Sequence, residues 1–177
     1  MTKPVLRIAI SGKSGCGNTS VGKLTASRLG LDFINWTFRN LAEKRGVPFE
    51  KALELARTDD SWDREVDAYQ VELAMRSNGC VLSSRLAIWM LEEADVRVYL
   101  RASPEVRAAR IVKREGGDLG EKARFTENRD KDDRARYLSL YNIDNDNYDF
   151  ADLIIDTDNL GIEEIVSAII GHVNRIH

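Results

Sequence analysis

The stretch SGKSGCGNTS, residues 11–20, decides the fold, because three glycines in it join an apolar segment to an amphipathic one. Residues 5–11, VLRIAIS, are rich in branched side chains and predict a buried strand. Residues 19–30, TSVGKLTASRLG, carry an apolar stripe at helical spacing and end on a glycine, which predicts a helix. A strand, a glycine turn and a helix N-terminus in this order form an anion site, since backbone N–H groups and the helix dipole both favour negative charge.

The glycine spacing fits the phosphate-binding pattern G-x-x-x-x-G-K-[ST], with Gly12 and Gly17 as the glycines and Thr19 as the hydroxyl that would ligate magnesium. Asn18 replaces the lysine of that pattern and supplies no positive charge. Lys13, inside the loop, either swings over bound phosphates or is a solvated lysine. A plain turn that binds nothing is the alternative for the whole segment, and the agreement of context and spacing disfavours it.

Further strand-like segments alternate with helical ones along the chain. This alternation predicts an α/β fold of the phosphate-loop NTPase type, with three layers (α/β/α) around a five-stranded parallel sheet. The other expected strands are 32–35, 80–84, 96–102 and 151–157. The other expected helices are 37–46, 48–58, 62–77, 105–115, 124–142 and 161–176, and 116–122 is expected to be a flexible hinge.

The length of 177 residues suits a single domain with two additions. We expect a core of residues 1–35, 79–115 and 143–177. A helical insert at 36–78 and a lid with its flanking helix at 116–142 fall outside the minimal unit and are candidates for parts that close over ligands.

Composition excludes several classes of protein. The net charge of -3 argues against bulk binding to nucleic acid or to an anionic membrane. Apolar runs are strand-sized, the N-terminus lacks the features of a secretion signal, and two cysteines make no disulfide framework. We therefore expect a cytoplasmic protein that acts on small molecules, as a monomer, with neither nucleic acid nor membrane as partner.

Arginines can supply the charge that the loop lacks. Arg85 directly follows the third strand, at the edge where parallel sheets bind ligands, although it could instead pair with nearby Glu92 or Glu93. Arg39 lies in the expected insert, either at the site or on a solvated face. Two helices carry spaced sets, which are either exposed ion-pair networks or anion-binding faces: Arg107, Arg110 and Arg114, and Arg129, Asp133 and Arg136.

Taken together, these residues resemble the phosphate-loop nucleoside monophosphate kinases, and most closely the cytidylate kinases of the short, archaeal-like type. The resemblance covers nearly the whole chain. It rests on residues 10–31, on FRNLAEKRG and WDREVDAYQ in the insert, on SSRLAIWM after the third strand, on VYLRASPEVRAARIVKREG, and on ENRDKDDRARYLSLYNID. Kinases of this type typically lack the loop lysine as well.

The resemblance implies transfer of the γ-phosphoryl group of ATP to CMP, and possibly dCMP, with Mg²⁺. It implies that ATP is bound by Gly12, Lys13, Ser14, Gly15, Cys16, Gly17, Asn18, Thr19, Ser20, Arg110 and Arg114. It implies that the monophosphate is bound by Arg39, Asp63, Asp67, Arg85, Arg129, Asp133 and Arg136. Lys13, Arg85, Arg129 and Arg136 are the expected catalytic residues, Thr19 is the expected metal ligand, and residues 156–161 resemble the adenine-side loop.

Two departures from the family pattern stand out. Ser83 occupies a position where these kinases often carry an acidic residue that helps to hold hydrated magnesium. NWTFR, residues 35–39, replaces a glycine-containing entry, and its Trp36 either stacks on a base or packs in the insert. Asp63, Asp67 and Gln70 could present polar groups to a base from one helix, or they could be solvated.

Two alternative functions stay open. A degenerate kinase would bind nucleotide without turnover, as Asn18 and Ser83 suggest. A kinase for another small acceptor would keep the lid arginines but would not need a monophosphate-clamping Arg39.

Overall fold

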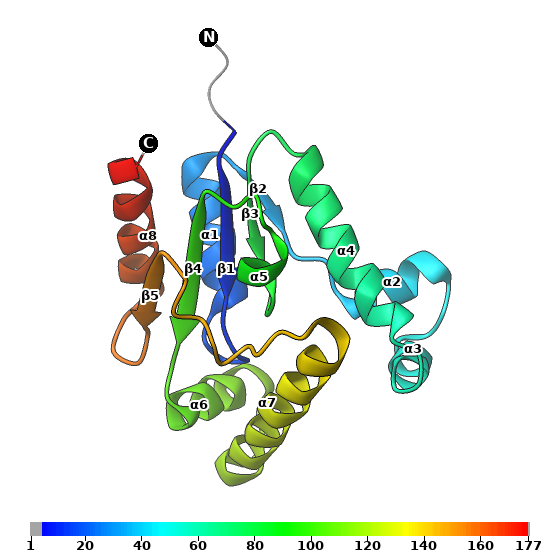
Figure 1. The fold of residues 1–177 in the computed structure, drawn as a ribbon. Coiled ribbons are helices and arrows are strands. Elements are labelled where there is room, and N and C mark those ends of the chain that lie inside the picture. Colours follow the sequence, from blue (N-terminus) through cyan, green and yellow to red (C-terminus); the bar gives the residue numbers. More distant parts are fainter. Residues whose placement is uncertain (1–4, 177) are drawn as a thin grey trace.

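The computed structural model describes residues 5–176, and in it five parallel strands form one sheet (Figure 1). The strands are β1 (Arg7–Ser11), β2 (Asp32–Ile34), β3 (Cys80–Ser83), β4 (Val96–Arg101) and β5 (Leu153–Asp156), in the order β2-β3-β1-β4-β5. The predicted five-stranded parallel sheet is confirmed. Because all strands run the same way, their carboxyl ends meet at one edge.

Helices cover both faces of this sheet, as the alternation predicted. Ile8 and Ile10 of β1 pack in one cluster with residues of α1 (Asn18–Leu29) and α8 (Ile162–Ile176). Ala9, which points the opposite way, packs with residues of α4 (Ser61–Arg76) and α5 (Ala87–Met90). Between residues 5 and 176, the model contains no helix with the length and hydropathy that crossing a bilayer would require.

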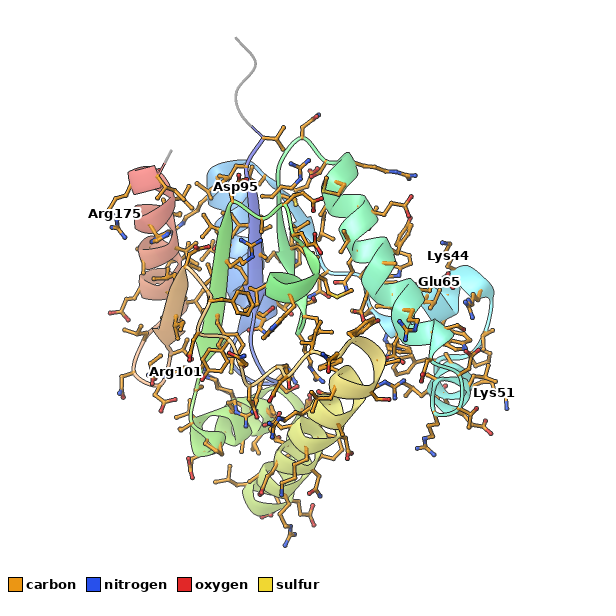
Figure 2. The ribbon with its side chains drawn as sticks, in the orientation of Figure 1. Lys44, Lys51, Glu65, Asp95, Arg101 and Arg175 are labelled. Carbon is orange, nitrogen blue, oxygen red and sulfur yellow. The ribbon has the colours of Figure 1, made fainter. Side chains whose placement is uncertain are left out.

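The segment between β2 and β3 forms a helical insert with a core of its own. It consists of α2 (Phe38–Arg45), α3 (Phe49–Ala56) and α4, and Leu41, Ala52 and Trp62 are buried among these helices. Figure 2 shows Lys44, Lys51 and Glu65 on this part of the molecule, away from the sheet. The insert therefore stands as a separate packing unit beside the sheet.

Two further helices lie across the carboxyl edge of the sheet. Asp95 precedes β4 and Arg101 ends it, and Figure 2 shows Arg101 on the side of α6 (Pro104–Glu115) and α7 (Leu119–Tyr141). Ser103 caps α6 through the N–H of Val106, as the Ser-Pro start predicts.

One expectation about secondary structure was wrong, and one short helix was not anticipated. The hinge expected at 116–122 is only residues 116–118, because Asp118 accepts a hydrogen bond from the N–H of Glu121 (2.9 Å) and starts α7 at Leu119. The turn itself consists of Gly116 and Gly117, both with positive φ (75° and 99°). The short helix α5 was not expected, because four residues carry too little periodicity to reveal it.

The contact between α1 and β3 leaves no room at Gly22. A Cβ atom there would lie 2.9 Å from Cβ of Ser83 and 3.0 Å from Cε2 of Phe33. The helix that follows the glycine loop can therefore approach the sheet only with glycine at this position.

We expect Gly22→Ala to lower the free energy of unfolding by about 1 to 3 kcal/mol, because the added methyl group must displace buried neighbours. Gly171→Ala is the matched control, since the nearest atom to its Cβ would be Nη1 of Arg175 at 3.9 Å, and it lies inside α8. That variant should be stabilised by about 0.5 to 1 kcal/mol through helix propensity. Urea denaturation of both variants measures this, and equal effects of the same sign would contradict it.

Candidate active site

A cavity of about 1030 Å³ opens at the carboxyl edge of the sheet, between the glycine loop, the insert and α7. It brings together all but one of the residues predicted for the site. The lining includes Gly12, Lys13, Ser14, Gly15, Cys16, Gly17, Asn18, Thr19, Ser20, Asp63, Asp67, Arg85, Arg110, Arg114, Arg129, Asp133 and Arg136. Segments far apart in the sequence thus converge on a single space.

The predicted residue that does not line this cavity is Arg39. Its side chain is exposed, and its guanidinium lies 4.1 Å from the centre of the Phe49 ring, on the outside of the insert. The cation–π contact between neighbouring helices explains this position. Helical periodicity alone could not decide between this face and the inner one.

The loop of residues 12–20 has the geometry of an anion site. Gly15 and Gly17 have φ values of 85° and 98°, which favour glycine. Gly17 is the N-cap of α1, no side chain caps the helix, and its first turn contains no acidic residue. The first N–H groups of α1 therefore remain available to an anionic ligand.

Asn18 holds the loop together from inside. Its Nδ2 donates to the carbonyl oxygen of Gly12 at 2.5 Å, and its Oδ1 is buried without a partner among residues 5–176. A Cβ on Gly12 would lie 2.6 Å from that Oδ1. Where the sequence pattern has a charged lysine, this chain therefore has a neutral hydrogen-bonding residue that crosses the loop.

Lys13 is paired with a carboxylate and is not the solvated lysine of the predicted alternative. Its Nζ forms an ion pair with Oδ1 of Asp146 at 2.6 Å, and its side chain is partly buried at the cavity wall. Asp146 lies after α7 and also contacts Arg134. The one cation of the loop is therefore paired with a carboxylate from a distant segment.

Ser83 is a buried contact between β3 and α1. Its side chain has no exposed surface, and its Oγ donates to the carbonyl oxygen of Asn18 at 2.8 Å. Asn35, after β2, donates to the carbonyl oxygen of Ser83 at 2.9 Å. Ser83 and Gly22 together leave no space for a longer acidic side chain, so the departure from the family pattern has a packing explanation.

Arg85 connects the loop to α7. It donates to Oγ of Ser14 at 2.9 Å and forms an ion pair with Asp133. The predicted alternative, pairing with Glu92 or Glu93, is wrong. Burial lowers the pKa of the Arg85 guanidinium, and the nearby charge of Arg129 acts in the same direction, so an added anion here would be stabilised.

Arg136 connects α7 to the insert. It forms an ion pair with Asp63, which is 6% exposed, and donates to the carbonyl oxygen of Ala56 at 2.9 Å. The hydrogen bond to Asp63 raises the pKa of Arg136. Arg129 lies on the same cavity with an exposed side chain. Of the five arginines that line the cavity, Arg85 and Arg136 are thus held by carboxylates of α7 and the insert.

Sequence reasoning did not assign a site role to Arg107, although it stands in the predicted row with Arg110. It is 4% exposed and donates to both carboxylate oxygens of Asp130, at 3.2 and 2.6 Å, and to the carbonyl oxygen of Ser14 at 3.2 Å. A buried arginine requires such partners. It fixes the loop to both α6 and α7.

The part of the cavity lined by Arg110, Leu160 and Ile162 is partly apolar. Arg110 donates to the carbonyl oxygen of Gly15 at 3.3 Å and to Thr157, at 2.9 Å to its Oγ1 and 2.6 Å to its carbonyl oxygen. Leu160 and Ile162, partly exposed, give this end an apolar surface. Arg114 pairs with its neighbour Glu115 at 2.5 Å and is largely exposed.

The inner face of α4 is buried rather than solvated. Gln70 is 4% exposed, and the hydroxyl of Tyr141 donates to Oδ2 of Asp67 at 2.8 Å. Burial raises the pKa of Asp67 to about 6, against the opposing hydrogen bond from Tyr141. Trp36 packs edge-on to Tyr69, with 4.7 Å between ring centres, so it belongs to the insert while also lining the cavity.

The fit for Mg²⁺ depends on Thr19. No group of three or more His, Cys, Asp or Glu side chains in the described part of the chain could hold a metal by itself. The exposed Thr19 side chain at the start of α1 lines the cavity. This suits Mg²⁺, which is commonly held by few protein oxygens together with substrate phosphates and water.

Proteins with similar sequences are found among the cytidylate kinases. Residues 7–159 match the model of the cytidylate kinase-like family. "Cytidylate kinase 2" of Borrelia garinii subsp. bavariensis is 44% identical over 96% of this chain and 97% of that protein. The cytidylate kinase of Archaeoglobus fulgidus is 38% identical over 93% of each.

Similarity to solved structures extends to the whole fold. A shikimate kinase from Bacteroides thetaiotaomicron superposes with a TM-score of 0.64, at 18% identity, over 96% of this chain and 98% of that one. A deoxyadenosine kinase from M. mycoides gives a TM-score of 0.61 at 18% identity, over 96% and 100%. These two show the fold alone. On the extent of the family match and the full-length relatives, this chain belongs to the cytidylate kinase-like family.

Proposed function

We propose that this chain transfers the γ-phosphoryl group of ATP to CMP, and also to dCMP, giving ADP and the nucleoside diphosphate. The observation that carries the proposal is the shared cavity, in which a phosphate-type loop faces three arginines and the buried polar face of α4. Membership in a family of cytidylate kinases supports the same reaction.

On the ATP side, backbone N–H groups of residues 12–20 would bind the phosphates. Arg110 supports the loop through Gly15, and Arg114 would contact the nucleotide from the rim. The apolar surface of Leu160 and Ile162 would receive the adenine ring. Mg²⁺, held by the Thr19 hydroxyl and the phosphates, would neutralise charge on the transferring group.

On the acceptor side, Arg85, Arg129 and Arg136 would bind the monophosphate and the transferring group. Two of them are already oriented by Asp133 and Asp63, so their positions are set before the ligand arrives. An oxygen of the acceptor phosphate would attack the γ-phosphorus as its bond to the β–γ bridging oxygen breaks. Catalysis then consists of positioning and charge neutralisation, without a covalent enzyme intermediate.

The first test is a screen of acceptors with ATP and Mg²⁺. We expect the rate of ADP formation at limiting acceptor to be highest with CMP, to follow with dCMP, and to be lower with UMP and AMP. Absence of turnover with every monophosphate, from folded protein, would contradict the proposal.

The same screen separates the alternatives. If ATP raises the melting temperature but no acceptor is phosphorylated, the chain is a nucleotide-binding module. Turnover with a small alcohol but with no monophosphate would indicate a kinase for another acceptor.

Arg39 does not line the cavity and would reach a bound monophosphate only after a movement of the insert. We propose that α2 closes over the monophosphate and brings Arg39 into the cavity. Arg39→Ala should then raise KM for CMP at least about tenfold and leave KM for ATP unchanged, because one charged hydrogen bond is lost. Glu43→Gln, on the same helix, is the control. A parent-like KM for CMP in Arg39→Ala would show that Arg39 belongs only to the outer surface.

Lys13 is proposed to leave Asp146 and contact the phosphates during turnover. Lys13→Met should lower kcat at least about tenfold, since no other cation belongs to the loop itself. Asp146→Asn frees the lysine and should keep kcat at or above the parent value. Steady-state kinetics with saturating CMP provides the measurement, and an unchanged kcat in Lys13→Met would count against this role.

A further inference from the structure

The face of α4 that lines the cavity presents two acceptors with spare capacity. Asp67 and Gln70 are three residues apart in the helix and so lie on one side of it. Oε1 of Gln70 is buried and has no hydrogen-bond partner among residues 5–176. Within the same part of the chain, Asp67 accepts one hydrogen bond, on Oδ2, which leaves Oδ1 for a ligand.

The cavity that holds these two groups is also lined by two aromatic side chains and a branched one, and the indole N–H of Trp36 is buried without a partner among residues 5–176. Trp36, Phe38 and Val66 line the same cavity beside Asp67 and Gln70. Aromatic and branched side chains with a few convergent polar groups are the usual surroundings of a bound heterocycle. An unsatisfied buried carbonyl oxygen in such a place indicates a ligand group that donates a hydrogen bond.

The charge state of Asp67 depends on its neighbours on two helices. Asp63 on α4 raises its pKa, whereas Arg136 and the hydroxyl of Tyr141 on α7 lower it, and burial is the largest cause of its value of about 6. Above pH 7, Asp67 is therefore mainly a carboxylate, which accepts hydrogen bonds and donates none.

We propose that Asp67 and Gln70 together select an acceptor base with an exocyclic amine, and so distinguish cytosine from uracil; this rests on the proposed function. The 4-amino group of cytosine has two hydrogens, one for each acceptor. The 4-oxo group of uracil has none. Gln70 can turn its amide to donate to that oxygen, but ionised Asp67 cannot adapt, so Asp67 contributes most of the selection.

The test compares kcat/KM for CMP and UMP at pH 8 in the parent and three variants. The parent should prefer CMP by at least about 100-fold, as expected for a site that hydrogen-bonds a substrate amine. Asp67→Asn should reduce the CMP/UMP ratio at least tenfold, mainly by improving UMP, because an amide can turn to suit either base. Gln70→Leu should reduce the ratio mainly by weakening CMP.

Glu72→Gln is the matched control, because Glu72 lies on the same helix, pairs with exposed Arg76 and does not line the cavity. Its ratio should equal that of the parent. Melting temperatures establish which variants are folded. If Gln70→Leu fails to fold, the CMP/UMP ratio of Asp67→Asn alone tests the proposal.

The pH dependence gives a second readout. In the parent, the CMP/UMP ratio should fall as pH is lowered through about 6, because protonated Asp67 can donate to the uracil oxygen. The phosphates of CMP and UMP titrate alike, so their effect cancels in the ratio. Asp67→Asn should show no such fall.

The inference is overturned if the parent uses CMP and UMP equally, or if both variants keep the parent ratio. Absence of turnover with every monophosphate is a different result, since it contradicts the proposed function. In that case, the ratio of calorimetric Kd values for CMP and UMP measures the selection at the binding step and tests the inference without turnover.

Discussion

The structure depends on how the carbonyl oxygens of the glycine loop are satisfied. A loop that offers its N–H groups to an anion must direct carbonyl oxygens the other way, where each needs a donor. Several of these donors are side chains. Asn18 donates to the carbonyl oxygen of Gly12, and Arg107 donates to that of Ser14. Arg110 donates to the carbonyl oxygen of Gly15, and Ser83 donates to that of Asn18. The backbone N–H groups of Cys16 and Val21 donate to the carbonyl oxygens of Lys13 and Gly17. The loop is therefore fixed by its surroundings, without bound nucleotide.

Arginine side chains also connect the loop to α7 and α7 to the insert. Arg107 forms an ion pair with Asp130 of α7. Arg85, which donates to Ser14, forms an ion pair with Asp133, one turn further along α7. Arg136, on the same helix, reaches Asp63 in the insert. Arg85 and Arg136 therefore link α7 to the glycine loop and to the insert.

The elements that the sequence predicted are those with local signals. The sheet, the helices of the insert, the capped start of α6 and the arginine row of α7 all follow from periodicity and caps within a short window. The partners that the sequence could not predict lie far away along the chain. Asp146 is the partner of Lys13 and Asp133 that of Arg85, and no local pattern relates such pairs. The stacking of Arg39 on Phe49 could not be predicted for a related reason, since a helix pattern does not show which face of α2 meets its neighbours.

The replacement of lysine by Asn18 follows from this arrangement. A lysine at position 18 would bring charge to the phosphates, but it would remove the amide that donates to Gly12, beside a glycine with no room for adjustment. The carbonyl oxygen of Asn18 would still accept from Ser83, so the first turn of α1 would keep its place while the other side of the loop lost its donor. In this chain Asn18 fixes the shape of the loop, and the cavity receives positive charge from arginines of α7 and from Arg85, which follows β3. Restoring the common pattern at this one position would therefore exchange the hydrogen bond to Gly12 for a charge in a cavity that arginines already line.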